Sequence, residues 1–129
     1  MKYLLIIMIS FFCLFQSCTE SNSIQGTKWE YKINEESISF IEFKADGSYV
    51  EYDAEVGEHL YGRYEKTNDR IILSQERGEY DNEFQEGSRH RTPKKKFEMI
   101  IKNGSQLGYF DRLKNGSWEN DYYFIKVNE

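Results

Sequence analysis

The stretch SISFIEFKADGSYVEYDA, residues 37–54, decides the fold class of this 129-residue chain. Apolar and aromatic residues recur through two segments, 37–44 and 48–54, and Ala45-Asp46-Gly47 lies between them. Asp-Gly between two such segments is a strong hairpin signal, because glycine adopts a positive φ without a steric penalty. The stretch therefore predicts two antiparallel strands joined by a tight turn.

Short segments of the same kind continue on both sides of this hairpin. Asn103-Gly104 and Asn115-Gly116 predict two more tight turns, and Gly62 in mid-strand predicts a bend or the close approach of another chain segment. No segment of about twelve residues has a helical period. The predicted strands are residues 26–33, 37–44, 48–54, 59–66, 70–76, 94–102, 106–113 and 118–127.

Eight short strands joined mostly by tight turns predict an all-β fold, an eight-stranded antiparallel up-and-down meander. Such a meander removes its exposed edges by closing into a lipocalin-like β-barrel. A barrel of eight strands either fills with side chains or holds one small ligand. A two-sheet β-sandwich is the alternative. Residues 77–93 are the longest predicted loop, and loops of this length are usually functional or disordered.

The first eighteen residues have the order of a bacterial lipoprotein signal. Lys2 precedes an apolar run from Leu4 to Phe15, and Ser17 precedes Cys18. The run is shorter than the roughly 20 residues that span a bilayer. We expect cleavage before Cys18 and acylation of that cysteine with chains such as palmitate, which gives stable anchoring when more than one chain is present. An uncleaved anchor helix and a secreted protein cut near Ser17 are the alternatives.

The expected domains are therefore a signal peptide (1–17), a lipidated cysteine with a polar tether (18–25) and one barrel domain (26–129). Thr19 follows the cysteine instead of the aspartate that retains enteric lipoproteins on the inner membrane, so attachment to the outer membrane is favoured. Whether the domain faces the periplasm or the cell surface stays open. The mature chain has no second cysteine, so its stability comes from packing and not from a disulfide.

Charge and composition exclude several classes of function. Without Lys2, 16 basic residues remain against 22 acidic ones, a formal charge of −6. This balance argues against nucleic-acid binding, which needs a basic surface. His59 and His90 have no metal-ligand spacing. Motifs for phosphate binding or nucleophilic catalysis are missing from the sequence. We therefore expect no metal, no cofactor and no enzymatic activity.

Two groups of residues are candidates for binding. The aromatic content is 16%, with ten tyrosines, and a tyrosine combines an apolar ring with a hydroxyl that can orient a ligand. The first candidate is a cavity lined by Tyr52, Tyr64, Tyr109 and Tyr122. The second is a basic interaction loop made by Arg89, Arg91, Lys94, Lys95 and Lys96. Neutralisation of the neighbouring acidic residues is the simpler explanation of that loop.

The chain resembles the small lipocalin-like lipoproteins of Bacteroidetes over the whole mature region. The elements that carry the resemblance are the signal ending in Cys18, the opening Gly26-Thr27-Lys28-Trp29, the hairpin Phe43-Lys44-Ala45-Asp46-Gly47-Ser48, the strand motif Gly62-Arg63-Tyr64 and the closing Tyr123-Phe124-Ile125-Lys126-Val127. Trp29 departs from the pattern, since it lies three residues after Gly26 and not two. The resemblance implies a barrel that binds a small apolar molecule.

Two hypotheses of function follow. In the first, the protein is a membrane-anchored envelope lipoprotein whose barrel binds a small apolar molecule without enzymatic activity, or has an accessory role. In the second, a ligand-free barrel acts on an envelope protein partner through the 77–93 loop. The state of the interior discriminates between them, because an open cavity favours the first and a packed core favours the second.

Overall fold

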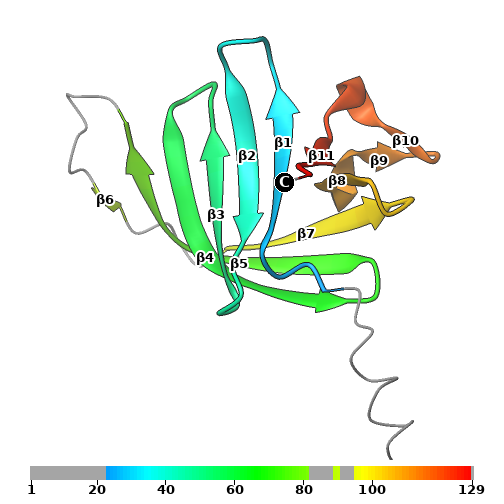
Figure 1. The fold of residues 1–129 in the computed structure, drawn as a ribbon, viewed down its shortest axis with the longest axis horizontal. Coiled ribbons are helices and arrows are strands. Elements are labelled where there is room, and N and C mark those ends of the chain that lie inside the picture. Colours follow the sequence, from blue (N-terminus) through cyan, green and yellow to red (C-terminus); the bar gives the residue numbers. More distant parts are fainter. Residues whose placement is uncertain (1–22, 82–88, 91–94, 129) are drawn as a thin grey trace, which may run out of the picture.

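The computed structural model describes residues 23–81, 89–90 and 95–128, which form an all-β fold with a closed, antiparallel, eight-stranded barrel (Figure 1). The barrel strands are β1 (Thr27–Lys32), β2 (Ile38–Phe43), β3 (Ser48–Asp53), β4 (Glu58–Thr67), β5 (Arg70–Tyr80), β7 (Lys95–Lys102), β8 (Gln106–Tyr109) and β11 (Phe124–Lys126). Each strand pairs with the next along the chain, β1 pairs with β11, and β4 pairs with β5, so the ring closes. The predicted barrel is confirmed, and the sandwich is excluded.

The predicted turns form for the expected reason. Gly47 has a φ of 87°, and the Asp46 carboxylate accepts hydrogen bonds from the Ser48 backbone and hydroxyl at 2.9 and 2.5 Å. Asn103 and Gly104 both have positive φ, at 54° and 69°, and join β7 to β8. Positive φ at both central residues matches the right-handed twist of the strands that flank a two-residue turn.

Gly62 lies at a close approach of another chain segment, as predicted. A Cβ atom at this position would overlap the backbone carbonyl of Ser74 and lie 2.9 Å from the Tyr49 ring. The β4–β5 register also shifts between Tyr61 and Gly62. A bulge of this kind bends the strand. One end of β4 and β5 therefore runs beside β1, β2 and β3, and the other end curves beneath the barrel (Figure 1).

Alternate residues of each strand fill the interior. Large side chains with no exposed surface stack along the barrel axis, and several of them face one another from β2, β5, β7 and β11. The fully buried set is Ile41, Phe43, Ile71, Leu73, Met99, Leu107 and Phe124. Trp29, 2% exposed, joins this set and donates its indole N–H to the Thr27 hydroxyl at 3.0 Å.

Three boundaries differ from the sequence prediction. Ile24 is 4% exposed and packs in the core, so the polar tether ends before it. Strand β5 continues to Tyr80, so the irregular segment starts later than residue 77. A short strand within it, β6 (Arg89–His90), pairs with Gly78 and Glu79. Hydrogen bonding across strands, which no local pattern encodes, extends β5.

The last two predicted strands are also shorter than expected. A 3₁₀ turn (Phe110–Arg112) ends β8, and a separate hairpin of β9 (Leu113–Lys114) and β10 (Ser117–Trp118) surrounds the predicted Asn115-Gly116 turn. A second 3₁₀ turn (Glu119–Asp121) leads into β11. Trp118 explains this hairpin, since its ring covers Gly108, where a Cβ would lie 2.9 Å from Cε3, and its N–H donates to Gln106 at 2.9 Å.

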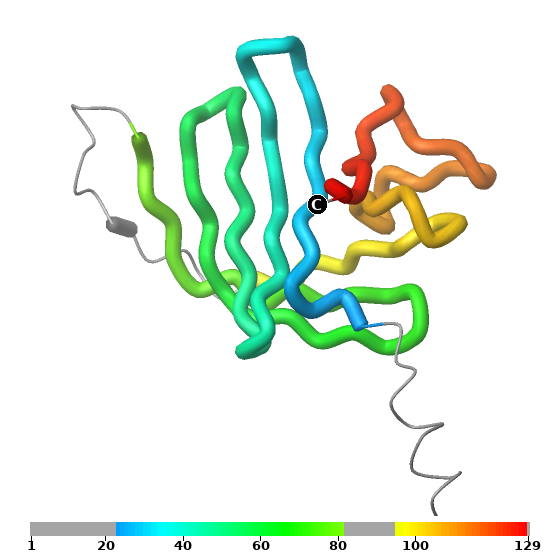
Figure 2. Tube along the Cα trace, in the orientation of Figure 1, coloured from blue at the N-terminus to red at the C-terminus, as the bar shows by residue number. Residues whose placement is uncertain are grey.

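The barrel has two distinct ends. The described chain begins at Ser23 beside the β4–β5 turn, and the β1–β2 and β3–β4 turns lie at the opposite end (Figure 2). We call these the tether end and the far end. The predicted signal peptide, Cys18 and most of the tether lie outside the described residues. No helix in the described part of the chain is long and apolar enough to span a membrane.

Candidate functional site

A buried carboxylic acid is the most unusual feature of the barrel interior. Glu51 lies on β3, two residues after the buried Tyr49, and is only 8% exposed. Its Oε1 atom accepts a hydrogen bond from the Tyr109 hydroxyl at 2.5 Å. Among the described residues, none donates a hydrogen bond to the other carboxylate oxygen, and none forms an ion pair with Glu51. Buried acids are costly unless paired, so this group is a candidate for function.

The surroundings of Glu51 favour its neutral form. Burial raises the pKa of its carboxyl, the Tyr109 hydrogen bond lowers it, the negative charges of Asp53 and Glu58 raise it, and the pKa is about 7 as a result. Asp53 pairs with Glu58 next to the β3–β4 turn. Glu51 pairs with Leu60, two residues further from that turn along each strand. Directly opposite residues share a face of the sheet, so Asp53 and Glu58 lie on the inner face between Glu51 and the far end.

The side chains of Tyr49, Tyr109 and Tyr122 all feel the charge of this acid. The Tyr109 ring lies 6.3 Å from Phe97, centroid to centroid. The Tyr31 and Tyr122 rings lie 4.7 Å apart, and both contact Phe124. Burial, together with the negative charges of Glu51, Asp53 and Glu55, raises the pKa of Tyr122 to about 12. Tyr122 therefore lies within electrostatic reach of three carboxylates.

The closing pairing between β1 and β11, next to these rings, is short. The β1–β11 ladder pairs only Trp29 with Lys126 and Glu30 with Ile125, so Tyr31 has a ladder partner only on β2. A groove of about 500 Å³ lies along this seam. We call it the seam groove, and its lining residues are Glu30, Tyr31, Lys32, Asp121, Tyr123, Ile125, Lys126 and Val127.

The wall of the seam groove and the buried acid lie on opposite faces of the sheet, because Glu30 and the exposed Ile125 pair on the outer face and Glu51 shares the inner face with Tyr49. Tyr31 lines the groove, its ring packs on Tyr122, and Tyr122 feels the charge of Glu51. Pockets of about 300–1,000 Å³ with apolar walls and few polar groups are typical of small-molecule sites. The groove can hold an apolar body against Tyr31 and Ile125, and Glu51 is not among its lining residues.

The structure brings together two of the four tyrosines expected to line a cavity. Tyr109 and Tyr122 both lie beside Glu51. Tyr64 instead donates to the Lys44 carbonyl at 2.8 Å and packs edge-on against Phe43, toward the tether end. Tyr52 lies on the outer face, because strand alternation places it opposite to Tyr49 and Glu51. The expected four-tyrosine cavity is corrected accordingly.

The sequence prediction missed Glu51 and Tyr31. The signal that could have found Glu51 is its parity, since it shares the face of Tyr49 in an alternating strand. Acidic side chains in strands are ordinarily solvated, so the position of Glu51 on the Tyr49 face does not by itself predict that its carboxyl is buried.

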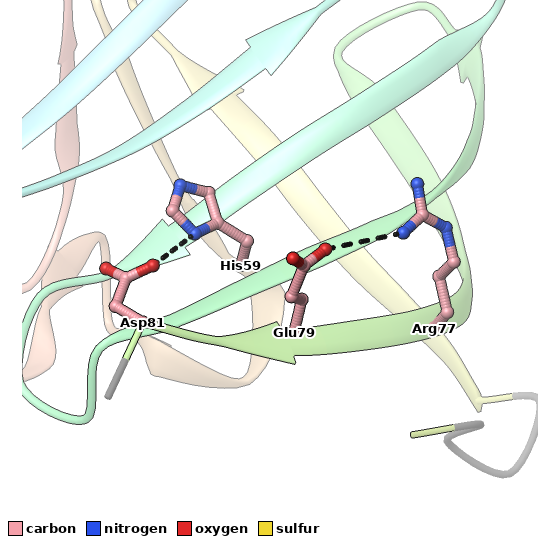
Figure 3. A network of polar contacts seen from close by, with 4 residues as sticks. All are labelled: His59, Arg77, Glu79 and Asp81. Carbon is pink, nitrogen blue, oxygen red and sulfur yellow. Dashed lines mark ion pairs between the residues drawn. The ribbon is translucent and has the colours of Figure 1, made fainter. Parts of the chain in front are cut away.

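The outer face carries a second cluster of polar and aromatic side chains (Figure 3). His59 Nδ1 lies 3.1 Å from Asp81 Oδ1, and Arg77 lies 3.9 Å from Glu79. Tyr52 and His59 pack at 4.5 Å between ring centroids, and Arg77 lies 3.9 Å above the Tyr61 ring. These side chains interact with one another in pairs, so we interpret the cluster as stabilising the surface of the barrel and not as a binding site.

The predicted basic loop lies largely outside the described residues. Arg91 and Lys94 are not described, and for Arg89 the structure gives only its backbone pairing with Glu79. Lys95 and Lys96 are exposed at the start of β7. Within the described residues, no group of three or more His, Cys, Asp or Glu side chains could hold a metal ion.

Comparison of the chain with protein-family models, curated proteins and solved structures found no match in any of the three. The assessment of function therefore depends on the chemistry of the site.

Proposed function

We propose that this protein is a non-enzymatic, membrane-anchored lipoprotein of the cell envelope, held by lipid on Cys18 at the outer membrane, whose barrel binds a small molecule through the seam groove. The observation that carries the proposal is Glu51, a buried acid with one carboxylate oxygen that no described residue satisfies. A buried polar group that a protein leaves incompletely satisfied commonly belongs to a binding site.

The structure changes the expected chemistry of the ligand. A purely apolar molecule would leave Glu51 without a further partner, and buried acceptors cost free energy when they stay unsatisfied. A ligand with an apolar body and a hydrogen-bond donor fits better. The body would contact Tyr31, Tyr123 and Ile125, which line the groove, and the donor would reach Glu51 only if the packed rings of Tyr31 and Tyr122 moved aside.

The position of the chain start supports a tethered binding module. Ser23 lies at the tether end, so a lipid on Cys18 five residues earlier would hold that end toward the membrane. The far end, where the rim acids Asp53 and Glu58 lie, would then face the aqueous space. A ligand could reach the groove without crossing the membrane.

The test is native mass spectrometry of the mature lipoprotein extracted from its native host. We expect a co-purifying molecule on the wild-type protein and on Glu65→Gln, a change at an exposed position of β4, and less of it on Glu51→Gln. Equal occupancy of all three proteins would indicate carried-over lipid. An unliganded mass for the wild type would overturn the proposal and favour the ligand-free barrel that acts on an envelope partner through residues 77–93.

A further inference from the structure

The two ends of the barrel differ in charge, although the chain as a whole is acidic. We propose that the tether end rests on anionic phospholipid headgroups, with its unpaired lysines against the phosphates, while the lipid on Cys18 holds the chain in the bilayer. That lipid is part of the proposed function, so the inference rests on it. The distribution of charge, the shape of the tether end and its distance from the anchor support the inference.

Basic residues gather at the tether end and acidic residues at the far end. Antiparallel pairing places the β2–β3, β4–β5 and β7–β8 connections at the tether end, together with both ends of the described chain. These segments, each with the two adjoining strand residues, contain Lys28, Lys44, Lys66, Arg70, Lys102 and Lys126 against Glu42, Asp46 and Asp69. The β1–β2 and β3–β4 turns at the far end, taken in the same way, contain Lys32 against Glu35, Glu36, Asp53, Glu55 and Glu58. A surface of negative phosphates would therefore attract the tether end and repel the far end.

Three of the lysines at the tether end keep their charge available. Arg70 and Lys28 already form ion pairs with glutamates, at 2.8 and 3.9 Å. By contrast, no ion pair between described side chains includes Lys44, Lys66 or Lys126. An ammonium group without a carboxylate partner can bind a phosphate without first breaking an ion pair inside the protein, so these three lysines are the ones we place against the headgroups.

The surface of the tether end is hollowed beside the start of the described chain. Ser23 and Lys66 line two cavities there, of about 230 and 480 Å³. Lys126 is the second lysine of the smaller cavity, and Tyr64 supplies a ring to the larger one. A headgroup that enters either cavity reaches Lys66, so the tether end can admit phosphates and does not merely touch a flat layer of them.

The anchor keeps this end close to the bilayer. Ser23 follows Cys18 by five residues, and a chain of that length spans at most about 18 Å when it is fully extended. The Debye length is about 10 Å at 0.1 M salt, so the tether end stays within about two Debye lengths of the headgroups. Each basic residue near an anionic surface favours the bound state about fivefold. Three unpaired lysines are therefore enough to seat a barrel that the anchor already brings to the surface.

The experiment measures how near each end of the barrel lies to the headgroups. The mature lipoprotein is reconstituted in vesicles of phosphatidylcholine alone, or of equal parts of phosphatidylcholine and phosphatidylglycerol, each with the same fraction of a lipid whose nitroxide headgroup quenches fluorescence. Ser105→Cys, exposed in the β7–β8 turn, and Val56→Cys, exposed in the β3–β4 turn, each take one fluorescent thiol label without a change of charge. We expect quenching at residue 105 to be roughly twofold stronger with phosphatidylglycerol, and quenching at residue 56 to be equal in both vesicles. The excess should vanish at about 1 M salt, where the Debye length is about 3 Å.

Charge variants separate this inference from the proposed function. Lys44→Gln with Lys66→Gln should remove most of the excess quenching at residue 105, and Lys95→Gln with Lys96→Gln, an equal change at the exposed start of β7, should keep it. Equal quenching in the two kinds of vesicle, or an excess that persists at high salt, would overturn the inference. An equal loss in both double variants would overturn the assignment to the tether end. A purified protein whose mass contains no acyl chain would instead overturn the anchor of the proposed function, before any vesicle is prepared.

Discussion

Replacing Glu51 with glutamine should stabilise the protein, and by an amount that grows with pH. The carboxyl has an ordinary pKa of 4.5 and a pKa of about 7 in the folded barrel. Below pH 4.5 the group is protonated in both the folded and the unfolded chain. Above that pH the unfolded chain loses the proton first, so the free energy of unfolding falls as pH rises, until the folded group also ionises above about pH 7.

The magnitude follows from the difference between the two pKa values. Each pKa unit corresponds to about 1.4 kcal/mol, so ionisation of Glu51 should cost the wild type about 3 kcal/mol of unfolding free energy above about pH 8. At about pH 5 the cost is about 1 kcal/mol, because this pH is only slightly above the pKa of the carboxyl in the unfolded chain, so only a small part of the full pKa difference has taken effect. The glutamine of the Glu51→Gln variant would keep an acceptor for the Tyr109 hydroxyl, so the variant should avoid the cost.

Urea denaturation of the chain from Ser21 measures this difference. The buried Trp29 and Trp118 report unfolding by fluorescence, and the comparison of wild type with variant removes the pH dependence of the other groups. The charged and titratable groups near Glu51 are Asp53 and Glu58 on β3 and β4 and the side chains of Tyr49, Tyr109 and Tyr122. A variant advantage that is the same at pH 5 and pH 8, or that also occurs in Glu65→Gln, would refute the reasoning.

Three further predictions concern the acid, the bulge and the anchor. Tyr109→Phe removes the hydrogen bond that lowers the pKa of Glu51, so that pKa should rise above 7 in a ¹³C NMR titration; a fall would contradict the assignment. Gly62→Ala should lower the unfolding free energy by about 3 kcal/mol or more in urea, because the new Cβ overlaps a backbone carbonyl. Gly104→Ala, strained only by its φ of 69° with open space around it, should cost about 1 kcal/mol, and equal losses would count against the close approach at Gly62. Cys18→Ser should abolish incorporation of labelled palmitate in a bacterial host, and label that persists would exclude acylation at that residue.

The first four strands follow closely from local sequence. Each of them starts and ends within one residue of the predicted position, because alternation of apolar and polar residues and the Asp46-Gly47 turn are local properties. The resemblance to lipocalin-like lipoproteins led to the same barrel, although the comparisons identify no family. The prediction of a close approach at Gly62 held because few other reasons place glycine in the middle of a strand.

Long-range contacts explain where the prediction failed. Trp118 packs on Gly108 and binds Gln106, and this contact turns the end of the predicted seventh strand and the start of the eighth into a separate hairpin. Asn115-Gly116 forms the expected turn, but inside that hairpin and not between two barrel strands. Local propensity cannot specify which glycine a tryptophan will cover.

The sequence by itself determined the first four strands and the Asp46-Gly47 and Asn103-Gly104 turns, because period and turn chemistry act over a few neighbouring residues, and it left the barrel and the sandwich as alternatives. The tertiary structure alone decided which face of β3 is enclosed, and so placed Glu51 against Tyr109 from a strand 58 residues away in sequence. It also left β1 and β11 with only two paired positions and opened the seam groove beside Tyr31. Burial and the electrostatic field at an acid are sums over distant strands, so they exist only once the barrel has closed.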